Sequence, residues 1–311
     1  MEFLHLPVME REVIEALRCG GGAVYVDGTV GGGGHAKAVL EASSPDGRLV
    51  GIDRDDDALD AARSALSGFG DRVTLVKANF REIRKVVEGL GIKGVDGVIL
   101  DLGVSSFQFD AIDRGFSFRN EARLDMRMDR SQKLSAYDLV NGADFDELTR
   151  IFREYGEERE ARRITRALLA ARERRPIETT VELANLISLS VPRKLQSKGI
   201  HPATRVFQAL RIAVNDELGS LKDGLSGSFD VLKGGGRLAV ISFHSLEDRI
   251  VKVFFRGLAT GCVCPPRFPQ CVCGQRPRAT LVTRKSITPS EEETGLNPRA
   301  RSARLRVVEK I

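Results

Sequence analysis

The alternation of short apolar segments with helical patterns constrains the fold of this chain more than any other feature. Segments that are apolar throughout and separated by helices are typical of parallel strands, buried on both faces of a sheet. We therefore expect an α/β fold. The segments that we interpret as its first four strands are Val24–Asp27, Leu49–Asp53, Val73–Val76 and Val95–Asp101, with helical patterns starting at Ala36 and across Ala58–Leu66.

The alternation stops after Asp101 and returns only near Asp216. Residues 112–214 are rich in Arg and Glu and carry helical patterns. The sequence therefore predicts a discontinuous α/β domain, residues 1–111 and 215–311, with a helical insertion at 112–214. The later elements that we expect are helices at Phe145–Arg153, Glu158–Arg172, Thr180–Leu189 and Asp216–Leu232, a strand at Arg237–Phe243, and an antiparallel strand pair from Ala279–Arg284 and Arg304–Val308.

A run of glycines lies between the first strand and the first helix. Residues 31–36 read Gly-Gly-Gly-Gly-His-Ala, which satisfies the dinucleotide-binding pattern G-x-G-x-x-A. Such a turn lets backbone N–H groups and a helix N-terminus approach a ligand closely. Taken alone, the pattern suits either a nicotinamide cofactor or S-adenosylmethionine.

The ends of the strands favour S-adenosylmethionine. Asp27 ends the first strand, where a carboxylate suits a cationic ammonium or sulfonium and repels a pyrophosphate. Phe80 follows the third strand, where its ring can stack on adenine. Asp53 and Asp101 end the second and fourth strands, and ligands of open α/β sheets bind outside these carboxyl ends. Asp53 is placed to accept hydrogen bonds from ribose hydroxyls, and helix capping is the competing interpretation of each Asp.

The positive charge is concentrated in the middle of the chain. The formal net charge is +5, and residues 112–214 carry 20 Lys and Arg against 15 Asp and Glu. From Leu183 to Asn215 there are cations and no acid. These cations either form a solvated helix face or contact the phosphates of a nucleic acid. They are Arg193, Lys194, Lys198, Arg205 and Arg211, and Arg299, Arg301, Arg304 and Arg306 are candidates for a second basic strip.

Neither the amino terminus nor any internal segment has the pattern of a signal peptide or a membrane span, so we expect a cytoplasmic protein without a membrane partner. Disulfides are disfavoured in that compartment. Cysteines in two Cys-x-Cys pairs can hold zinc, although Cys-x₂-Cys is commoner, or they can remain free thiols in a Pro-rich loop. We assign no metal ligand from the sequence. The clustered cysteines are Cys262, Cys264, Cys271 and Cys273.

Long sequence blocks that run nearly from end to end carry a family resemblance. They are His5–Met9, Asp27–His35, Gly51–Asp55, Leu100–Ser106, Arg114–Phe118, Leu124–Asp129, Tyr155–Arg159, His201–Gln208, Ile241–Arg249 and Asn297–Ser302. In these blocks the chain resembles the bacterial 16S rRNA cytosine-N4 methyltransferase family, of the MraW or RsmH type. The number and length of the blocks make the resemblance specific.

The resemblance implies a Rossmann-like class I S-adenosylmethionine methyltransferase with a mostly helical inserted domain that recognises RNA. The implied substrate is N4 of a cytidine in the decoding centre of 16S rRNA, within the small (30S) ribosomal subunit. Gln108 enters the site through the resemblance alone. The implied cofactor-binding residues are Gly33, Gly34 and His35 at the methionine end, Asp53 at the ribose, and Phe80, Asp101 and Gln108 around the rest of the pocket.

The exocyclic amine of cytosine is a poor nucleophile because its lone pair is delocalised into the ring, so acceptor groups near it would assist the reaction. Many amino-methylating enzymes place an Asp/Asn/Ser-Pro-Pro-aromatic tetrad after the fourth strand. Here residues 101–104 read Asp-Leu-Gly-Val, without the prolines or the aromatic. We expect Asp101 and the Ser105 hydroxyl to contact the amine, and an ordinary loop hydroxyl is the alternative for Ser105.

His244 follows the fifth strand and is expected to face the same crevice, as a substrate-side or a structural residue. Ser245 has the pattern of the N-cap of the next helix. Two other functions compete with methyl transfer. A nicotinamide-dependent oxidoreductase is disfavoured by Asp27 and by the lack of an obvious proton-transfer dyad, and a non-catalytic ribosome-binding factor would need neither the glycine turn nor Asp53. The oligomeric state is open, a dimer included.

Overall fold

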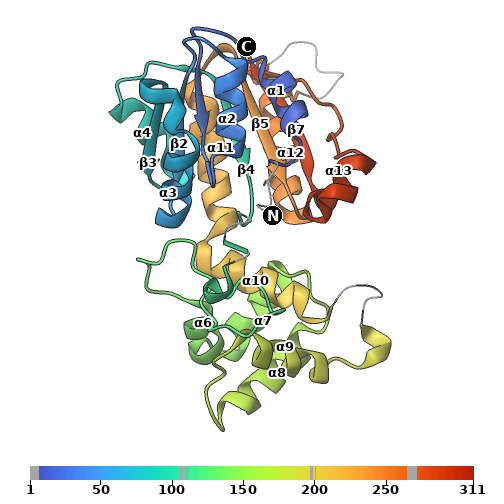
Figure 1. Ribbon diagram of the computed structural model, residues 1–311. Coiled ribbons are helices and arrows are strands. Elements are labelled where there is room, and N and C mark those ends of the chain that lie inside the picture. The colour runs from blue at the N-terminus through green and yellow to red at the C-terminus, as the bar shows by residue number, and fades with distance from the viewer. Residues whose placement is uncertain (1–6, 106–107, 110, 197–198, 200, 265–271) are drawn as a thin grey trace. The chain divides into compact units, whose positions relative to one another are not determined.

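The computed structural model describes residues 7–105, 108–109, 111–196, 199, 201–264 and 272–311 (Figure 1). The chain forms two compact units. The first unit joins Met1–Gly103 to Leu218–Ile311, and the second is Val104–Glu217. No helix in the described part of the chain is long and apolar enough to span a bilayer.

A mixed sheet organises the first unit. Its described strands lie in the order β3-β2-β1-β4-β5-β7-β6. Strands β1 to β5 are parallel, and β7 is antiparallel to both β5 and β6. The expected α/β fold and its antiparallel end are therefore confirmed. The strands are β1 (Val24–Asp27), β2 (Arg48–Asp53), β3 (Val73–Lys77), β4 (Val95–Asp101), β5 (Leu232–Ser242), β6 (Ala279–Leu281) and β7 (Arg304–Lys310).

Helices cover both faces of this sheet (Figure 1). Alternate strand residues supply two separate apolar clusters, because successive side chains of a strand point to opposite faces. Tyr25 and Ile99 pack with α1, α2 and α3, whereas Val26 and Val98 pack with α4, α11 and α12. The helices of this unit are α1 (Glu10–Leu17), α2 (Gly34–Ala42), α3 (Asp56–Ala65), α4 (Ile83–Gly89), α11 (Glu217–Val231, with Glu217 in the second unit), α12 (Ser245–Ala259) and α13 (Glu291–Leu296), with short 3₁₀ turns η1 (Ser67–Arg72), η2 (Phe80–Glu82) and η5 (Pro298–Ser302).

The strand order places a topological switch point between β1 and β4. The chain moves outward from β1 through β2 to β3, and then returns to β4 on the other side of β1. Ligands of open α/β sheets bind in the crevice outside the carboxyl ends of the strands at such a point. Asp27 and Asp101, which end these two strands, therefore border the place where a ligand is expected.

The second unit is helical in its described part and has its own apolar core, built from residues such as Leu148, Phe152 and Leu210. Helix α8 begins at Ala161 and not at Glu158 as the sequence pattern suggested, because its N-cap Glu160 has a non-helical backbone (φ −90°, ψ 18°). The helices are α6 (Ala136–Gly142), α7 (Phe145–Glu154), α8 (Ala161–Arg172), α9 (Thr180–Ser190) and α10 (Ala203–Asn215), with 3₁₀ turns η3 (Ile112–Arg114) and η4 (Arg193–Leu195).

Candidate active site

The glycine turn after β1 presents bare backbone to the switch point. Gly31 and Gly33 have positive φ angles of 50° and 88°, which glycine adopts without strain. Gly33 is the N-cap of α2, and no described side chain caps this helix. Helix α2 begins at Gly34, two residues before the sequence pattern suggested. An uncapped helix N-terminus has N–H groups available for a ligand.

Asp53 closes the glycine turn from the end of β2. Its Oδ2 accepts a hydrogen bond from the N–H of Gly31 at 3.0 Å, and its Oδ1 accepts one from the N–H of Asp55 at 3.0 Å. Burial raises the pKa of Asp53, and these backbone donors oppose the shift. The backbone of Arg54 also donates to Asp53. A carboxylate has about four acceptor sites, so one further hydrogen bond, such as that from a ribose hydroxyl, can be accommodated.

Asp27 is the most deeply buried acid at this edge, with an exposed fraction of 1%. Its Oδ1 accepts a hydrogen bond from the N–H of Thr29 at 3.1 Å. Burial raises the pKa of Asp27 to about 7, and the charge on His35 works against this shift. The side chain is therefore divided between its neutral and its charged form near neutral pH.

His35 and Asp101 meet across the switch point. Nε2 of His35 lies 3.5 Å from Oδ2 of Asp101. Burial lowers the pKa of His35, but the nearby carboxylates of Asp101 and Asp27 outweigh it, so the pKa is raised overall. Within the described residues, both ring nitrogens of His35 and Oδ1 of Asp101 are buried and have no hydrogen-bond partner, and Nε2 has only the ion contact with Asp101. Buried polar atoms are normally paired, so these atoms point to a ligand.

Thr29 is a residue of this site that the sequence did not single out. Its Oγ1 accepts a hydrogen bond from the N–H of Asp101 at 2.7 Å. The contact ties the loop after β1 to the end of β4 and fixes Asp101 beside the glycine turn. Its only sequence signal is its place between Asp27 and the glycines.

Phe80 lies in η2, directly after Asn79, whose side chain caps this turn by accepting from the N–H of Arg81 at 3.1 Å. The ring packs on α11 at Gly224. A Cβ at Gly224 would come within 2.3 Å of Cδ2 of Phe80. The ring position thus depends on a glycine far along the chain.

Ser105 and Gln108 belong to the second unit. Oγ of Ser105 accepts from the N–H of Gln108 at 3.2 Å, and Oε1 of Gln108 accepts from the N–H of Ser105 at 3.1 Å. This reciprocal pair is a capping box, for which Ser-x-x-Gln is a known pattern. Both side chains therefore have a local structural partner, and Gln108 is buried.

The helix after β5 is capped by His244, so the expectation that Ser245 caps it is wrong. Nδ1 of His244 accepts from the N–H of Glu247, and Oε2 of Glu247 accepts from the N–H of Phe243 at 2.8 Å. A capping box pairs the N-cap residue with a Glu or Gln three residues later. Glu247 lies three residues after His244, so the N-cap is His244 and not Ser245. His244 thus has a structural role as a helix cap, which is one of the two roles that the sequence left open.

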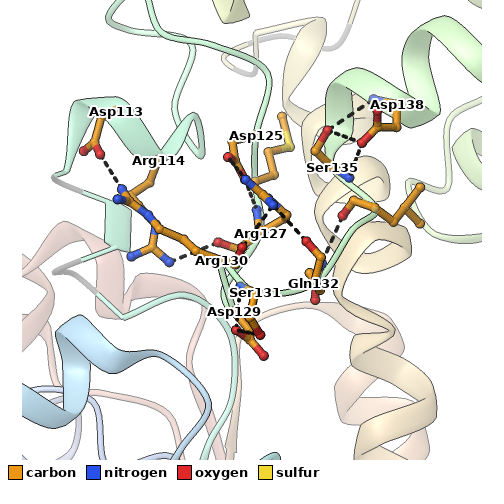
Figure 2. Close-up of polar contacts among 12 residues, drawn as sticks. Asp113, Arg114, Asp125, Arg127, Asp129, Arg130, Ser131, Gln132, Ser135 and Asp138 are labelled. Carbon is orange, nitrogen blue, oxygen red and sulfur yellow. Dashed lines mark hydrogen bonds and ion pairs between the residues drawn. The ribbon is translucent and has the colours of Figure 1, made fainter.

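Many arginines of the second unit are engaged within it (Figure 2). Arg114 is buried, and its Nη2 donates to the carbonyls of Arg127 and Met128 at 3.0 and 2.8 Å. Arg127 pairs with Asp125 at 2.7 Å. These cations hold the 113–138 segment in place. Figure 2 also shows an ion pair between Arg130 and Asp113.

Two candidates for the basic strips are likewise engaged. Arg211 makes a bidentate pair with Glu217 at 2.8 and 2.9 Å, and Arg306 makes one with Asp248 at 2.7 and 3.1 Å. Arg211 and Arg306 are therefore ion-paired within the protein, and the interpretation of these two residues as solvated or phosphate-binding cations is wrong. Arg193 and Lys194 are exposed, and Lys198 lies outside the described residues.

Carboxylates at the ends of neighbouring parallel strands, around an uncapped glycine turn, define the cofactor edge of a Rossmann-like class I methyltransferase that uses S-adenosylmethionine. The family model of the MraW methylases matches residues 2–311, and the chain belongs to this family. The resemblance inferred from the sequence blocks is confirmed.

Full-length relatives agree with this assignment. The chain is 57% identical over 310 residues to the ribosomal RNA small subunit methyltransferase H of Geobacter sp. strain M21, covering 100% of this chain and 99% of the relative. It is 54% identical over 311 residues to the protein of the same name from Symbiobacterium thermophilum, covering 100% of this chain and 98% of the relative.

Proposed function

We propose that this methyltransferase acts on small-subunit ribosomal RNA, at N4 of a cytidine in the decoding centre, within the 30S particle. The observation that carries the proposal is the 57% identity, over the whole chain, to a relative named as a small-subunit rRNA methyltransferase. Because the proposed substrate is the ribosome, the proposal includes a cytoplasmic location for this protein. The oligomeric state is not part of it.

The cofactor-binding roles follow from the contacts at the switch point. The residues fit S-adenosylmethionine, because partnerless buried atoms on His35 and Asp101 lie beside an uncapped helix N-terminus. We assign Gly33, Gly34 and His35 to the methionine end. Asp53 is assigned to the ribose hydroxyls, because its carboxylate keeps an acceptor site beyond those that its backbone donors occupy. Phe80 is assigned to the adenine, and Asp101 and Gln108 to the rest of the pocket.

Asp27 supplies the charge that a cationic ligand needs. The bound cofactor provides a methyl group on a positively charged sulfur. A buried carboxylate beside that cation is stabilised in its charged form, and the attraction is stronger than in water because the surroundings are less polar. Asp27 therefore favours S-adenosylmethionine over ligands with a pyrophosphate.

Asp101 is the proposed partner of the target amine. Methyl transfer is an in-line displacement, in which the protein mainly positions the nucleophile and stabilises charge. Oδ1 of Asp101 has no hydrogen-bond partner among the described residues, and its Oδ2 faces His35. Oδ1 can therefore accept an amine hydrogen, which localises the nitrogen lone pair. We also propose the Ser105 hydroxyl as a contact of the target amine, in addition to its acceptance of the Gln108 N–H.

The second unit is the proposed RNA-recognition domain. Its exposed cations Arg193 and Lys194 lie in η4, close in the chain to the exposed His201, whose ring stacks on Phe118 at 4.7 Å. Cations attract phosphates, and exposed rings can stack on unpaired bases. The target base must leave its stack before it can enter an active site.

The test is transfer of a tritiated methyl group to 30S subunits from a strain that lacks this enzyme, followed by nucleoside analysis. N4-methylcytidine at one decoding-centre position supports the proposal. A different methylated nucleoside, or label in another RNA, overturns the substrate assignment. A chain that binds 30S subunits without transferring label would be an assembly factor.

A further inference from the structure

We propose that Cys262, Cys264 and Cys273 bind a Zn²⁺ ion that fastens the connection between α12 and β6. This site lies within the first unit and uses none of the residues assigned to methyl transfer. Cys271 lies outside the described residues, so the proposal is argued from the other three cysteines.

The sulfur atoms converge although the cysteines are separated along the chain. Ligand atoms of Cys262, Cys264 and Cys273 all lie within 4.8 Å of one another, and the Sγ atoms of Cys262 and Cys273 are 3.7 Å apart. Zn–S bonds of about 2.3 Å in a tetrahedral site place sulfur atoms about 3.8 Å apart. The spacing of Cys262 and Cys273 is that of two ligands of one zinc ion.

Burial in the described apolar core does not account for the position of these thiols. Cysteine is among the most frequently buried residue types, yet Cys262 and Cys273 are exposed and Cys264 is only partly buried. Val263 and Val272, which neighbour them in the chain, are exposed by 59% and 74%. The described residues of this segment therefore contribute no apolar core that would bring the sulfur atoms together.

Hydrogen bonds already hold the two arms of the connection side by side. The N–H of Arg278 donates to the carbonyl of Leu258 at 2.8 Å, and Nε2 of Gln275 donates to the carbonyl of Thr260 at 3.2 Å. The described parts between α12 and β6 contain no helix or strand. A long connection without regular structure has a high conformational entropy, and a metal ion that joins its arms reduces it.

The surrounding charge suits a thiolate site. Residues 249–290 include no Asp or Glu, and Arg256, Arg276 and Arg278 are among their cations. Three thiolates on one Zn²⁺ leave a net negative charge, which nearby cations stabilise. Each thiol loses its proton to solvent when the ion binds, so zinc affinity should fall as the pH is lowered.

The test is titration of the reduced, metal-free full chain with Co²⁺ and then with Zn²⁺. One equivalent of cobalt should produce the thiolate charge-transfer band and the visible bands of a tetrahedral site, and zinc should remove them. In Cys262→Ser and Cys273→Ser, apparent zinc affinity should fall by more than the roughly 10–100-fold cost of losing an outer-shell partner. Cys19→Ser is the matched control, since Cys19 lies outside the cluster, and it should bind cobalt as the parent does.

Thermal melting separates a metal site from a folding defect. The zinc-loaded parent should melt at a lower temperature after a chelator is added, whereas Cys273→Ser should melt at the same temperature with and without it. Absence of the cobalt bands in the parent overturns the proposal, as does their persistence in both cluster variants. A disulfide between Cys262 and Cys273 in protein purified without oxygen, with no bound zinc, overturns it as well.

Discussion

Nε2 of His35 and Oδ2 of Asp101 lie 3.5 Å apart and join the first turn of α2 to the end of β4. Each of the two side chains keeps a buried atom that has no partner among the described residues. The Thr29 hydroxyl holds the backbone of Asp101 at the same place. Contacts within the protein therefore hold the switch point together, and its unpaired atoms leave hydrogen-bonding capacity for a ligand.

Asp53→Asn should weaken binding of S-adenosylhomocysteine. The amide keeps one acceptor oxygen but loses the charge, and hydrogen bonds to charged groups contribute about 1.5–3 kcal/mol. We expect a roughly 10- to 150-fold rise in Kd by calorimetry. Asp56→Asn is the matched control, because Asp56 is an exposed acid three residues away that pairs with Lys77. Equal affinities for Asp53→Asn and the parent would show that the ribose lies elsewhere.

Affinity for S-adenosylmethionine should increase as the pH rises through about 7. The pKa of Asp27 is raised to about 7, chiefly by burial, and a bound cation favours the carboxylate, so binding releases a proton. Linkage of one proton changes the affinity by at most about tenfold per pH unit. Calorimetry in buffers of different ionisation enthalpy measures the proton release. In Asp27→Asn the release should shrink and affinity at pH 8 should fall, and unchanged proton release would contradict the assignment.

Asp27→Asn should lower the affinity for the cofactor at pH 8 but raise the stability of the fold at that pH. Because the pKa of Asp27 is higher in the folded chain than the usual 3.8, the folded state binds the extra proton, and the parent loses stability as the pH rises from about 4 through 7. Asn avoids this loss and can still accept from the N–H of Thr29. The melting temperature of Asp27→Asn, relative to the parent, should therefore be higher at pH 8 than at pH 5. A difference that does not vary with pH would argue against a buried, titrating Asp27.

The sequence predicted the sheet and its acidic edge because both depend on local patterns. Apolar runs identify β1, β2 and β4 one at a time, and the parallel arrangement brings Asp27, Asp53 and Asp101 to the same edge without any knowledge of side-chain contacts.

The contacts between distant residues could not be predicted in this way. The pairing of Arg306 with Asp248 joins β7 to α12, and the packing of Phe80 on Gly224 joins η2 to α11. Neither pair has a sequence spacing that marks it. His244 differs, because Glu247 three residues later carries the signal of a capping box, but Ser245 is the commoner type of cap and concealed it.

Gly224→Ala should displace the ring of Phe80 and weaken cofactor binding. The added Cβ would lie 2.3 Å from the ring, and overpacking of this kind costs about 1–3 kcal/mol of stability. Gly257→Ala is the matched control, because Gly257 lies in α12 with nothing within 4 Å of the added Cβ. It should be neutral or stabilise by about 0.4–1 kcal/mol. Melting and cofactor titration check both, and intact cofactor binding in Gly224→Ala would remove Phe80 from the adenine site.

Arg193→Ala and Lys194→Ala should each reduce the salt dependence of binding to 30S subunits. Both side chains are exposed in η4, and each phosphate contact contributes about 0.7–0.9 to the slope of log affinity against log salt concentration. Cofactor affinity should not change, because neither residue belongs to the proposed cofactor site. Arg11→Ala is the control, since Arg11 is an exposed cation of α1 that pairs with Glu15. If the slope is the same in the parent and in both variants, η4 does not contact the RNA backbone.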